Sequence, residues 1–463
     1  MEFLKSLSNG LNNVVNFLND YLWGWPMIIF LVGTHILLTL YTKGVQRKVF
    51  LGIKLSVSKD DNTKGDVSLF GALTTALAST VGTGNIIGVG TAIALGGPGA
   101  VLWTWIVGIF GIATKYGETF IAVKHRKKLE DGSYLGGAMT ALEDLKKPFL
   151  AYFFAIVTML CAFGIGCGVQ SNAIASLLSE NFGVKNWITG VILAILTFVV
   201  IFGGIKSIAN VCTKLVPFMS ILYSLGCIAI LVINAKFLPA TILTILKCAF
   251  NGKAIAAGFI GATIKEAMRY GVARGLFSNE SGMGSAPMAS AAGKAENAVK
   301  PALVGSTGVF WDTVVICLLT GLVITSCVIA NPNIDASIIS DGSVLCSECF
   351  KTIPYIGMPL LVFGVITFAY STILGWNYYA TQCVRYLFKK DIASKIYLLL
   401  WVIVIFLGTV IDLSAVWNAA DMLNALMVIP NVIAILLLRK EIKKDTEYYL
   451  YQNHLDDEDT SLQ

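Results

Sequence analysis

Charged residues are scarce in this sequence of 463 residues: they make up 13% of it, against about 25% in a typical soluble domain. Hydrophobic residues make up 56%, and the mean hydropathy is +0.74. A chain of this composition cannot cover a core of its size with polar side chains. The scarcity of charge therefore excludes a water-soluble globular protein and favours one whose surface faces a lipid bilayer.

Histidine is scarce as well, since His35, His125 and His454 are the three in the chain and lie far apart. A membrane enzyme needs a cluster of catalytic or metal-binding groups, so the sequence predicts a protein that is not an enzyme. Most of the ten cysteines lie in apolar stretches. Cys346 and Cys349 lie close together in a polar segment without further metal ligands, which leaves a local disulfide or two free thiols.

Long hydrophobic runs fill most of the chain. A membrane-spanning helix needs about 20 apolar residues, and about eleven runs qualify. The fold class expected is therefore an all-α polytopic membrane protein with one transmembrane domain over residues 1–444 and a disordered cytoplasmic tail over 445–463. The start is rich in asparagine rather than basic, unlike a cleavable signal. The runs lie near 21–41, 72–96, 99–122, 149–178, 187–204, 209–233, 254–278, 303–329, 355–383, 392–412 and 415–438.

Basic residues gather in alternate loops. They are dense around residues 43–64, 124–147, 206–214, 294–300, 385–395 and 439–444, and sparse in the loops between. Cytoplasmic loops of membrane proteins carry the excess of lysine and arginine. With eleven helices, this pattern places the C-terminus in the cytoplasm and the N-terminus outside the cell membrane.

The second run is interrupted by glycine. Gly82, Gly84, Gly88 and Gly90 lie within nine residues, and each costs a helix about 1 kcal/mol relative to alanine. Backbone unwound inside a bilayer needs other partners. Carbonyls before the break can face a cation, and amides after it begin a half-helix whose positive end suits a carboxylate. Close helix packing is the alternative interpretation, and the polar residues Ser79, Thr80, Thr83 and Asn85 favour a site.

A second interruption lies at residues 274–287, where Gly275, Gly282, Gly284 and Pro287 accompany polar side chains. Glu280 is an intramembrane carboxylate there, and such a group is a functional candidate. Glu280 either gates or couples transport, or forms a structural pair with Arg269 or Arg274. Glu266 could take that structural role instead. Five helices separate the starts of the two broken helices. The sequence therefore predicts one extra helix at 21–41 and a five-plus-five inverted repeat, over 72–233 and 254–438, with two discontinuous helices around a transport site.

Polar residues in other runs support such a site. Phe163, Gly166 and Gln170 share a face at helical spacing, as do Phe368, Ser371, Thr372 and Trp376. Gln170 either meets a solute or bonds another helix, and Trp376 either closes a pocket or packs in the core. The hydroxyls of Ser371 and Thr372 either bond their own helix or ligate a hard cation. Asp312 is an ion ligand or a structural partner, and Lys115 is expected to pair with Glu118.

Several of these residues lie in motifs that resemble those of a known protein family. The chain resembles the alanine or glycine:cation symporter family over nearly its whole length, in TVGTGNIIGVG, GGPGAVLWTWIVGIFG, GLFSNESGMGSAP and FAYSTILGWNYY. The resemblance implies sodium-coupled uptake of small neutral amino acids, alanine and glycine foremost. It also implies the inverted-repeat fold of the bacterial leucine transporter.

The resemblance also implies residue roles. The Thr83 and Gly84 amides would hold the substrate carboxylate, with Gln170 nearby. Sodium would bind the carbonyls of Ala78, Val81 and Phe368 with the hydroxyls of Ser371 and Thr372, and a second sodium ion near Asn85 is allowed. Phe277, Thr372 and Trp376 would border the substrate side chain. The substrate-binding set expected is Thr80, Gly82, Thr83, Gly84, Asn85, Phe163, Gly166, Gln170, Phe277, Thr372 and Trp376.

Three rival functions remain. Proton coupling would make a carboxylate such as Glu280 indispensable, whereas sodium coupling can rely on neutral oxygens. An ion channel should lack paired broken helices around an occluded site. A polytopic membrane enzyme is disfavoured by the scattered histidines.

Overall fold

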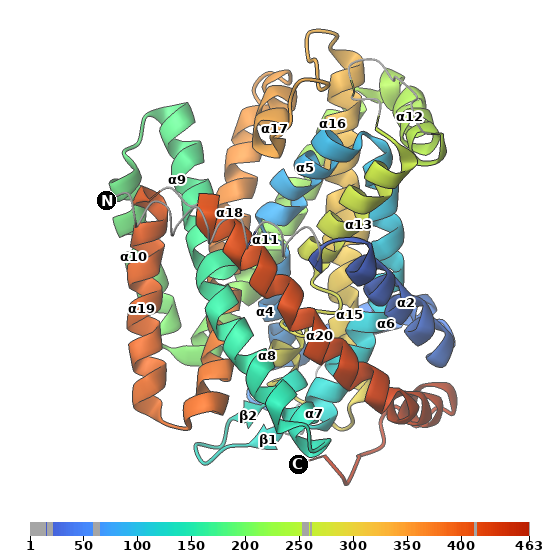
Figure 1. Ribbon diagram of the computed structural model, residues 1–463, viewed down its shortest axis with the longest axis vertical. Helices are drawn as coiled ribbons and strands as arrows, with labels where there is room; N and C mark the ends of the chain where they lie inside the picture. The colour runs from blue at the N-terminus through green and yellow to red at the C-terminus, as the bar shows by residue number, and fades with distance from the viewer. Residues whose placement is uncertain are drawn as a thin grey trace.

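The computed structural model describes residues 22–58, 65–251, 262–411 and 414–462, together with Val15 and Phe259. These residues are almost entirely helical (Figure 1). The first part of the chain forms α2 (Trp25–Tyr41), η1 (Val45–Lys48), α3 (Val49–Ser56), α4 (Leu69–Thr80), η2 (Thr83–Asn85), α5 (Ile87–Gly96), α6 (Gly99–Lys124), α7 (Ala138–Asp144), α8 (Pro148–Cys161), η3 (Ala162–Gly168), α9 (Val169–Phe182), α10 (Asn186–Ile201) and α11 (Gly204–Ile233).

The second part runs from η4 to η6. It forms η4 (Ala235–Phe237), α12 (Leu238–Phe250), α13 (Ile264–Asn279), α14 (Pro287–Ala291), α15 (Val299–Val309), η5 (Phe310–Cys317), α16 (Leu318–Ala330), α17 (Gly342–Lys351), α18 (Gly357–Phe388), α19 (Asp391–Val410), α20 (Ser414–Asp445) and η6 (Thr446–Tyr451). Two short strands, β1 (Lys127–Lys128) and β2 (Tyr134–Leu135), pair antiparallel after α6.

Seven of the described helices are long and apolar enough to cross a membrane, or up to nine if each of two bent pairs is one span. The count is compatible with about eleven spans without confirming that number. The expected starts at residues 21 and 254 lie outside the described residues. The limits of the two repeats remain predictions.

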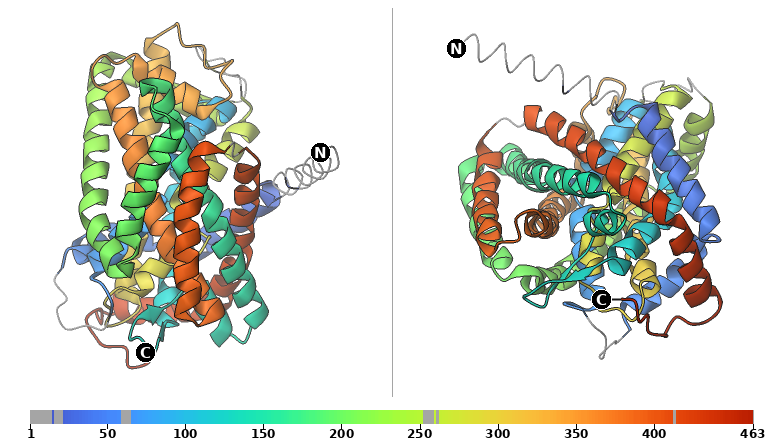
Figure 2. Two further views of the ribbon diagram at one scale, coloured as in Figure 1. Left: turned by 90° about the vertical axis from the view of Figure 1, so that its left-hand side faces the viewer. Right: turned by 60° about the horizontal axis from the view of Figure 1, so that its bottom comes forward.

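The helices form one bundle. Helices α10 and α19 lie side by side at one edge, and α20 crosses α8 and reaches α2 (Figures 1 and 2). Both broken helices lie inside: α13 packs on α5 and α6, and α4 packs on α11 and α18. The site expected from sequence therefore lies where buried helices meet.

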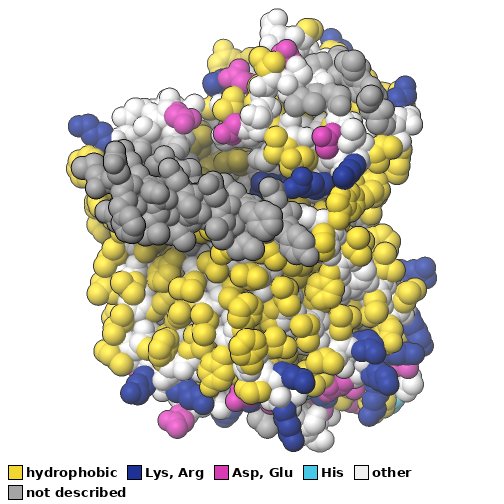
Figure 3. Space-filling model, in the orientation of Figure 1, with side chains coloured by type: hydrophobic (Ala, Val, Ile, Leu, Met, Phe, Trp, Pro, Cys, Tyr) yellow, Lys and Arg dark blue, Asp and Glu magenta, His cyan; other side chains and the backbone are white. Residues whose placement is uncertain are grey.

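The outer surface reflects the hydrophobic composition of the chain. Figure 3 shows a broad band of hydrophobic side chains, with lysine and arginine along its lower edge and also above it. Basic loops from distant parts of the chain meet the C-terminal segment there, as in the ion pairs of Lys43 with Glu447 (3.0 Å) and Lys300 with Asp456 (3.2 Å). The basic loops that contain Lys43 and Lys300 therefore lie at the same end of the bundle as the C-terminal segment.

The expectation of a disordered tail is wrong for residues 446–462. η6 continues α20, and the chain then folds back onto the bundle. Lys124 at the end of α6 binds both Asp445 (2.9 Å) and Asp459 (2.6 Å), and Asn297 donates to the carbonyl of Leu455 (2.8 Å). The acidic composition suggested a solvated segment, but these carboxylates meet basic groups that the fold brings to them.

Replacing Asp459 with asparagine is expected to loosen the tail. Burial raises the pKa of the Asp459 carboxyl, but hydrogen bonds from Lys124 and Ser461 outweigh it, and the net pKa is lowered. Docking therefore favours the ionised form: its contribution is present above the ordinary pKa and is lost as pH falls through the docked pKa. A partly exposed charged hydrogen bond is worth about 1 kcal/mol, so amide hydrogen exchange in 446–462 should speed up about fivefold.

Asp456→Asn is the matched control, because the Asp456 side chain is 89% exposed and pairs with Lys300 at the surface. Exchange should change little in this variant. Equal acceleration in both variants would show that the buried contact does not hold the tail.

Candidate functional site

The first break begins where α4 stops at Thr80. Gly82 is extended (φ −133°, ψ −159°), and α5 resumes at a bend of 62°. The Gly82 amide donates to Asn85 Oδ1 (2.8 Å), so the Ala78 carbonyl loses the amide that would continue the helix. Asn85 thus binds the backbone of the break, and the carbonyl oxygen of Ala78 is left without its helical hydrogen bond.

Two buried amides at this break have no acceptor. Among the described residues, none accepts a hydrogen bond from the backbone amide of Thr83 or Gly84. Buried backbone N–H groups are nearly always paired. They precede α5, whose N-terminal end carries partial positive charge. Together they form a place for an anionic group inside the protein.

Neutral oxygens gather on the other side of the break. Ser371 Oγ lies 3.4 Å from the Val81 carbonyl and 2.9 Å from the Phe368 carbonyl. Thr372 Oγ1 lies 3.3 Å from the Ser79 carbonyl and 3.0 Å from that of Phe368. Such oxygens suit a hard cation. No group of three or more His, Cys, Asp or Glu suited to a metal occurs among the described residues, so a cation here would depend on neutral ligands.

Small residues let α18 approach the break this closely. A Cβ on Gly82 would lie 2.5 Å from Thr372 Oγ1, and one on Gly375 would lie 2.7 Å from the Ser79 amide nitrogen. The predicted proximity of Gly82, Thr372, Ser371, Val81 and Phe368 is therefore present.

Gln170 also reaches the first break. Its Oε1 accepts from Thr83 Oγ1 (3.1 Å), and its Nε2 donates to the Ile165 carbonyl (3.0 Å). The residue follows η3, a π-helical turn, a feature that often marks functional positions. Of the two interpretations left open by the sequence, Gln170 does bond another helix element, and its partner belongs to the break.

Three expected pocket residues lie around this arrangement. A Cβ on Gly166 would meet Trp376, whose side chain is 1% exposed, and one on Gly84 would lie 3.4 Å from Phe277 Cδ1. Trp376 and Phe277 thus border the break.

Phe163 and Thr80 are not brought to this group. The ring of Phe163 packs on Tyr397 (4.6 Å between centroids) and Trp401 of α19, because the π-helical turn changes the spacing that a regular helix would give. Thr80 Oγ1 donates to the Ala76 carbonyl (3.3 Å) and lines a separate cavity of about 10 Å³ beside Lys115 and Asn279. These contacts place both side chains apart from the first break, and their assignment to the substrate set stays a prediction.

Asp312, in the π-helical turn η5, connects the two breaks. It accepts from Asn85 Nδ2 (2.6 Å) at the first break and from Ser278 Oγ (3.0 Å) at the end of α13, and also from Thr313 Oγ1 (2.6 Å). The Asn85 amide orientation follows from this network. Asp312 is therefore held by neutral donors rather than by a structural ion pair.

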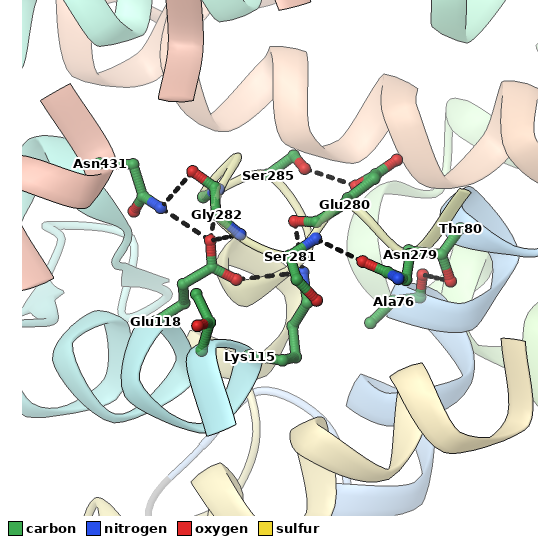
Figure 4. Close-up of polar contacts among 12 residues, drawn as sticks. Ala76, Thr80, Lys115, Glu118, Asn279, Glu280, Ser281, Gly282, Ser285 and Asn431 are labelled. Atoms are coloured by element: carbon green, nitrogen blue, oxygen red, sulfur yellow. Dashed lines mark hydrogen bonds and ion pairs between the residues drawn. The ribbon is translucent and has the colours of Figure 1, made fainter. Parts of the chain in front are cut away.

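The second break runs from Glu280 to residue 286, later than Gly275 suggested. Gly275 lies within α13, where a Cβ would lie 2.6 Å from Val107 of α6. Glu118 Oε1 accepts from the amides of Gly282 (2.7 Å) and Gly284 (2.9 Å) and from Asn431 Nδ2 (2.7 Å). Figure 4 shows the contacts of Glu118 with Gly282 and Asn431 at the loop between α13 and α14.

The expected pair of Lys115 and Glu118 is confirmed at 3.1 Å. The structural pairs expected between Glu280 and Arg269 or Arg274 are not found among the described residues. Glu266 caps α13 by accepting from the Thr263 amide (2.8 Å), and Arg274 lies over the Phe277 ring (5.8 Å). Arg269 lies over the neighbouring Tyr270 ring (5.6 Å).

Sequence reasoning missed Glu118 and Asn431 as caps of the second break. The signal in the sequence was weak, because Glu118 and Asn431 are polar residues in two distant apolar runs. No neighbouring residue indicated that either side chain would contact residues 282–284. Cys346 and Cys349 are free and buried thiols of α17, so the disulfide alternative is wrong. α17 packs on α5, where Cys346 Sγ approaches the Ile86 carbonyl (3.4 Å).

Comparisons with known proteins agree with this architecture. The model of the sodium:alanine symporter family matches residues 8–462. The chain is 43% identical to the sodium/alanine symporter AgcS of Methanococcus maripaludis, over 94% of this chain and 97% of that protein. It is 34% identical to a putative sodium/proton-dependent alanine carrier, YrbD, of Bacillus subtilis, over 91% and 89% of the two chains.

Two solved structures share the fold. One is MhsT in complex with L-phenylalanine, with a TM-score of 0.54 and 16% identity over 81% of this chain and 89% of that one. The other is a Na⁺-coupled sialic acid symporter, with a TM-score of 0.57 and 15% identity over 88% and 86%. The all-α class with discontinuous helices, expected from the sequence, is confirmed by this likeness.

Proposed function

Because the chain belongs to the sodium:alanine symporter family, we propose that it imports alanine or glycine together with sodium by alternating access. The observation that carries this proposal is the pair of unpartnered Thr83 and Gly84 amides beside the oxygens of Val81 and Phe368. The carboxylate of an amino acid supplies the acceptor that these amides lack, and sodium supplies the charge that the oxygens suit.

In this proposal sodium binds the carbonyls of Ala78, Val81 and Phe368 and the hydroxyls of Ser371 and Thr372. Ala78 contributes because its carbonyl has lost the Gly82 amide. Sodium would order the break, and the substrate would then complete it. A second sodium ion near Asn85 is part of the proposal, since Asn85 Oδ1 keeps a lone pair beyond its bond to Gly82.

Substrate size would be set by Trp376 and Phe277. The indole is buried against Gly166, and Phe277 lies at Gly84, so both rings border the break where the substrate side chain would lie. We further propose that the basic end of the bundle, with the C-terminal segment, is cytoplasmic and that the N-terminus is outside.

Uptake of radiolabelled alanine into proteoliposomes tests the function. An imposed sodium gradient should drive accumulation, and replacing sodium with potassium or choline should abolish it. Uptake that ignores sodium but follows an imposed pH gradient would establish the rival proton-coupled transporter instead.

Asn85→Ala and Gln170→Ala are each expected to weaken alanine binding about 5- to 150-fold. Each removes a buried side chain that contacts the break, and a buried polar group left unpaired costs about 1–3 kcal/mol. Asn172→Ala is the matched control, because Asn172 donates to the Gly408 carbonyl (3.1 Å), away from the break. Scintillation proximity binding should separate the variants. Normal binding in both Asn85→Ala and Gln170→Ala would remove the proposed pocket.

Trp376→Leu is expected to admit larger substrates. Removing the indole frees volume beside Gly166, so competition by leucine or methionine for alanine uptake should strengthen about tenfold, given about 1–3 kcal/mol for steric exclusion. Trp311→Leu is the control for loss of a tryptophan, because Trp311 is 38% exposed. Unchanged selectivity in Trp376→Leu would show that the indole does not line the pocket.

A further inference from the structure

Glu280 is the first residue of the second break, and its surroundings differ from those of other buried acids. It caps α13 in the left-handed region (φ 53°), which is unusual for a residue other than glycine. The residue is 3% exposed. Its carboxylate makes one hydrogen bond in the described part of the chain, accepting from the hydroxyl of Ser285 in its own loop (Figure 4).

Lys115 lies near this carboxylate but makes no ion pair with it in the described part of the chain. Its ammonium group binds Glu118 Oε2 (3.1 Å) and the backbone carbonyl of Glu280 (2.8 Å). Glu118 in turn accepts from two amides and Asn431. The buried ammonium group of Lys115 is therefore paired with a different carboxylate, that of Glu118.

Asp312 gives the internal comparison. It is also buried without a cation, but three side chains donate to it: those of Asn85, Ser278 and Thr313. Several donors can hold a buried carboxylate in its ionised form. Glu280 has a single hydroxyl, which is too little to replace the water that an ionised carboxylate loses on burial.

The other groups that face Glu280 do not supply a positive charge. Asp312 of η5, Cys161 of α8 and Tyr379 of α18 interact with it, and each is neutral or acidic. His35 of α2, which packs against α6, binds Thr114 (2.6 Å) rather than Glu280. The Trp376 indole N–H faces the carboxylate without hydrogen-bond geometry.

We propose that Glu280 is a proton-binding site: its carboxyl is protonated in the closed arrangement described here and releases the proton when the second break opens to water. The ligand is one proton, held on a carboxyl oxygen and shared with Ser285. Water reaching an opened loop would solvate the carboxylate and take the proton. Closure of the break then requires a proton to return.

Infrared spectroscopy of the purified, full-length protein tests this directly. The wild type should show the carbonyl stretch of a protonated carboxylic acid at neutral pH, and Glu280→Gln should lack it. Because that variant could fail to fold, wild-type protein labelled with carboxyl-¹³C glutamate provides a second test. The band should shift with labelled glutamate and stay in place with labelled aspartate.

Four outcomes would overturn the proposal. The first three are a missing band, a band that shifts only with labelled aspartate, and a band that appears only when choline replaces sodium. The last would mean that a sodium ion occupies the carboxylate. Loss of the band on adding alanine would assign the group to the substrate ammonium, and would also overturn the proposal.

Transport provides a second readout, and this arm rests on the proposed function. Sodium-driven alanine uptake should fall at alkaline pH by up to about tenfold per pH unit, since one proton is needed for closure. Glu280→Gln should lose this dependence, while Glu266→Gln, on the exposed start of α13, should keep it. If no alanine is transported, the proposed function fails while the infrared test stands.

Discussion

Sodium dependence should collapse when Ser371 and Thr372 are both replaced by alanine. The double variant removes both side-chain oxygens that face the carbonyls of Ser79, Val81 and Phe368. A hydrogen bond or ligand contact to a charge is worth about 1.5–3 kcal/mol. Losing two should raise the sodium concentration for half-maximal uptake by about 100-fold or more. The measurement is alanine uptake into proteoliposomes over a series of sodium concentrations.

Thr367→Ala is the matched control. Thr367 lies one turn earlier on α18 and donates to the Phe363 carbonyl (2.7 Å), so its hydroxyl serves its own helix. Thr372→Ser, which keeps the oxygen, should retain most of the sodium affinity. If the double alanine variant had the wild-type sodium requirement, the cation would have to bind elsewhere.

The sequence predicted the break and the polar face of α18 from local signals, whereas their assignment to one sodium site came from the family resemblance. Glycines weaken a helix wherever they occur, and Phe368, Ser371 and Thr372 fall on one face by helical spacing alone. The structure adds the approach of α18 to the break, which Gly82 and Gly375 permit.

Other parts could not be read from the sequence because their cause is not local. The π-helical turn η3 changes the direction in which the Phe163 side chain points. No residue pattern in the sequence predicted the extra residue that such a turn contains. Glu280 was given partners nearby on its own helix, whereas Lys115, Glu118 and Asn431 reach the second break from α6 and α20. The C-terminal segment was read from its acidic composition, but Lys124 holds it.

The two breaks also differ in a way that composition does not predict. At the second break the amides of Gly282 and Gly284 are occupied by Glu118, while at the first break those of Thr83 and Gly84 have no acceptor among the described residues. The Gly282 and Gly284 amides are therefore closed to an anionic solute by Glu118, whereas the Thr83 and Gly84 amides are open to one. This asymmetry supports placing the substrate carboxylate there and leaves Glu280 with a separate task.

Gly166→Ala is expected to weaken alanine binding strongly. A methyl group at this position would lie 2.6 Å from Trp376 Cγ and closer still to its Cβ. Overpacking of this kind costs about 1–3 kcal/mol, which corresponds to about 5- to 150-fold weaker binding. Gly33→Ala on α2 is the control, since a Cβ there meets nothing within 4 Å. Equilibrium binding of labelled alanine measures the difference.

The double variant Gly166→Ala with Trp376→Leu shows what the glycine is for. Leucine keeps Cβ and Cγ, the atoms of Trp376 nearest to the added methyl group, so it should not rescue binding. The defect would then come from separating α18 from the helix that carries Gln170, and with it the Thr83 contact. Rescue by leucine would mean instead that the indole ring alone defines the space, and that the close approach of the two helices is not required.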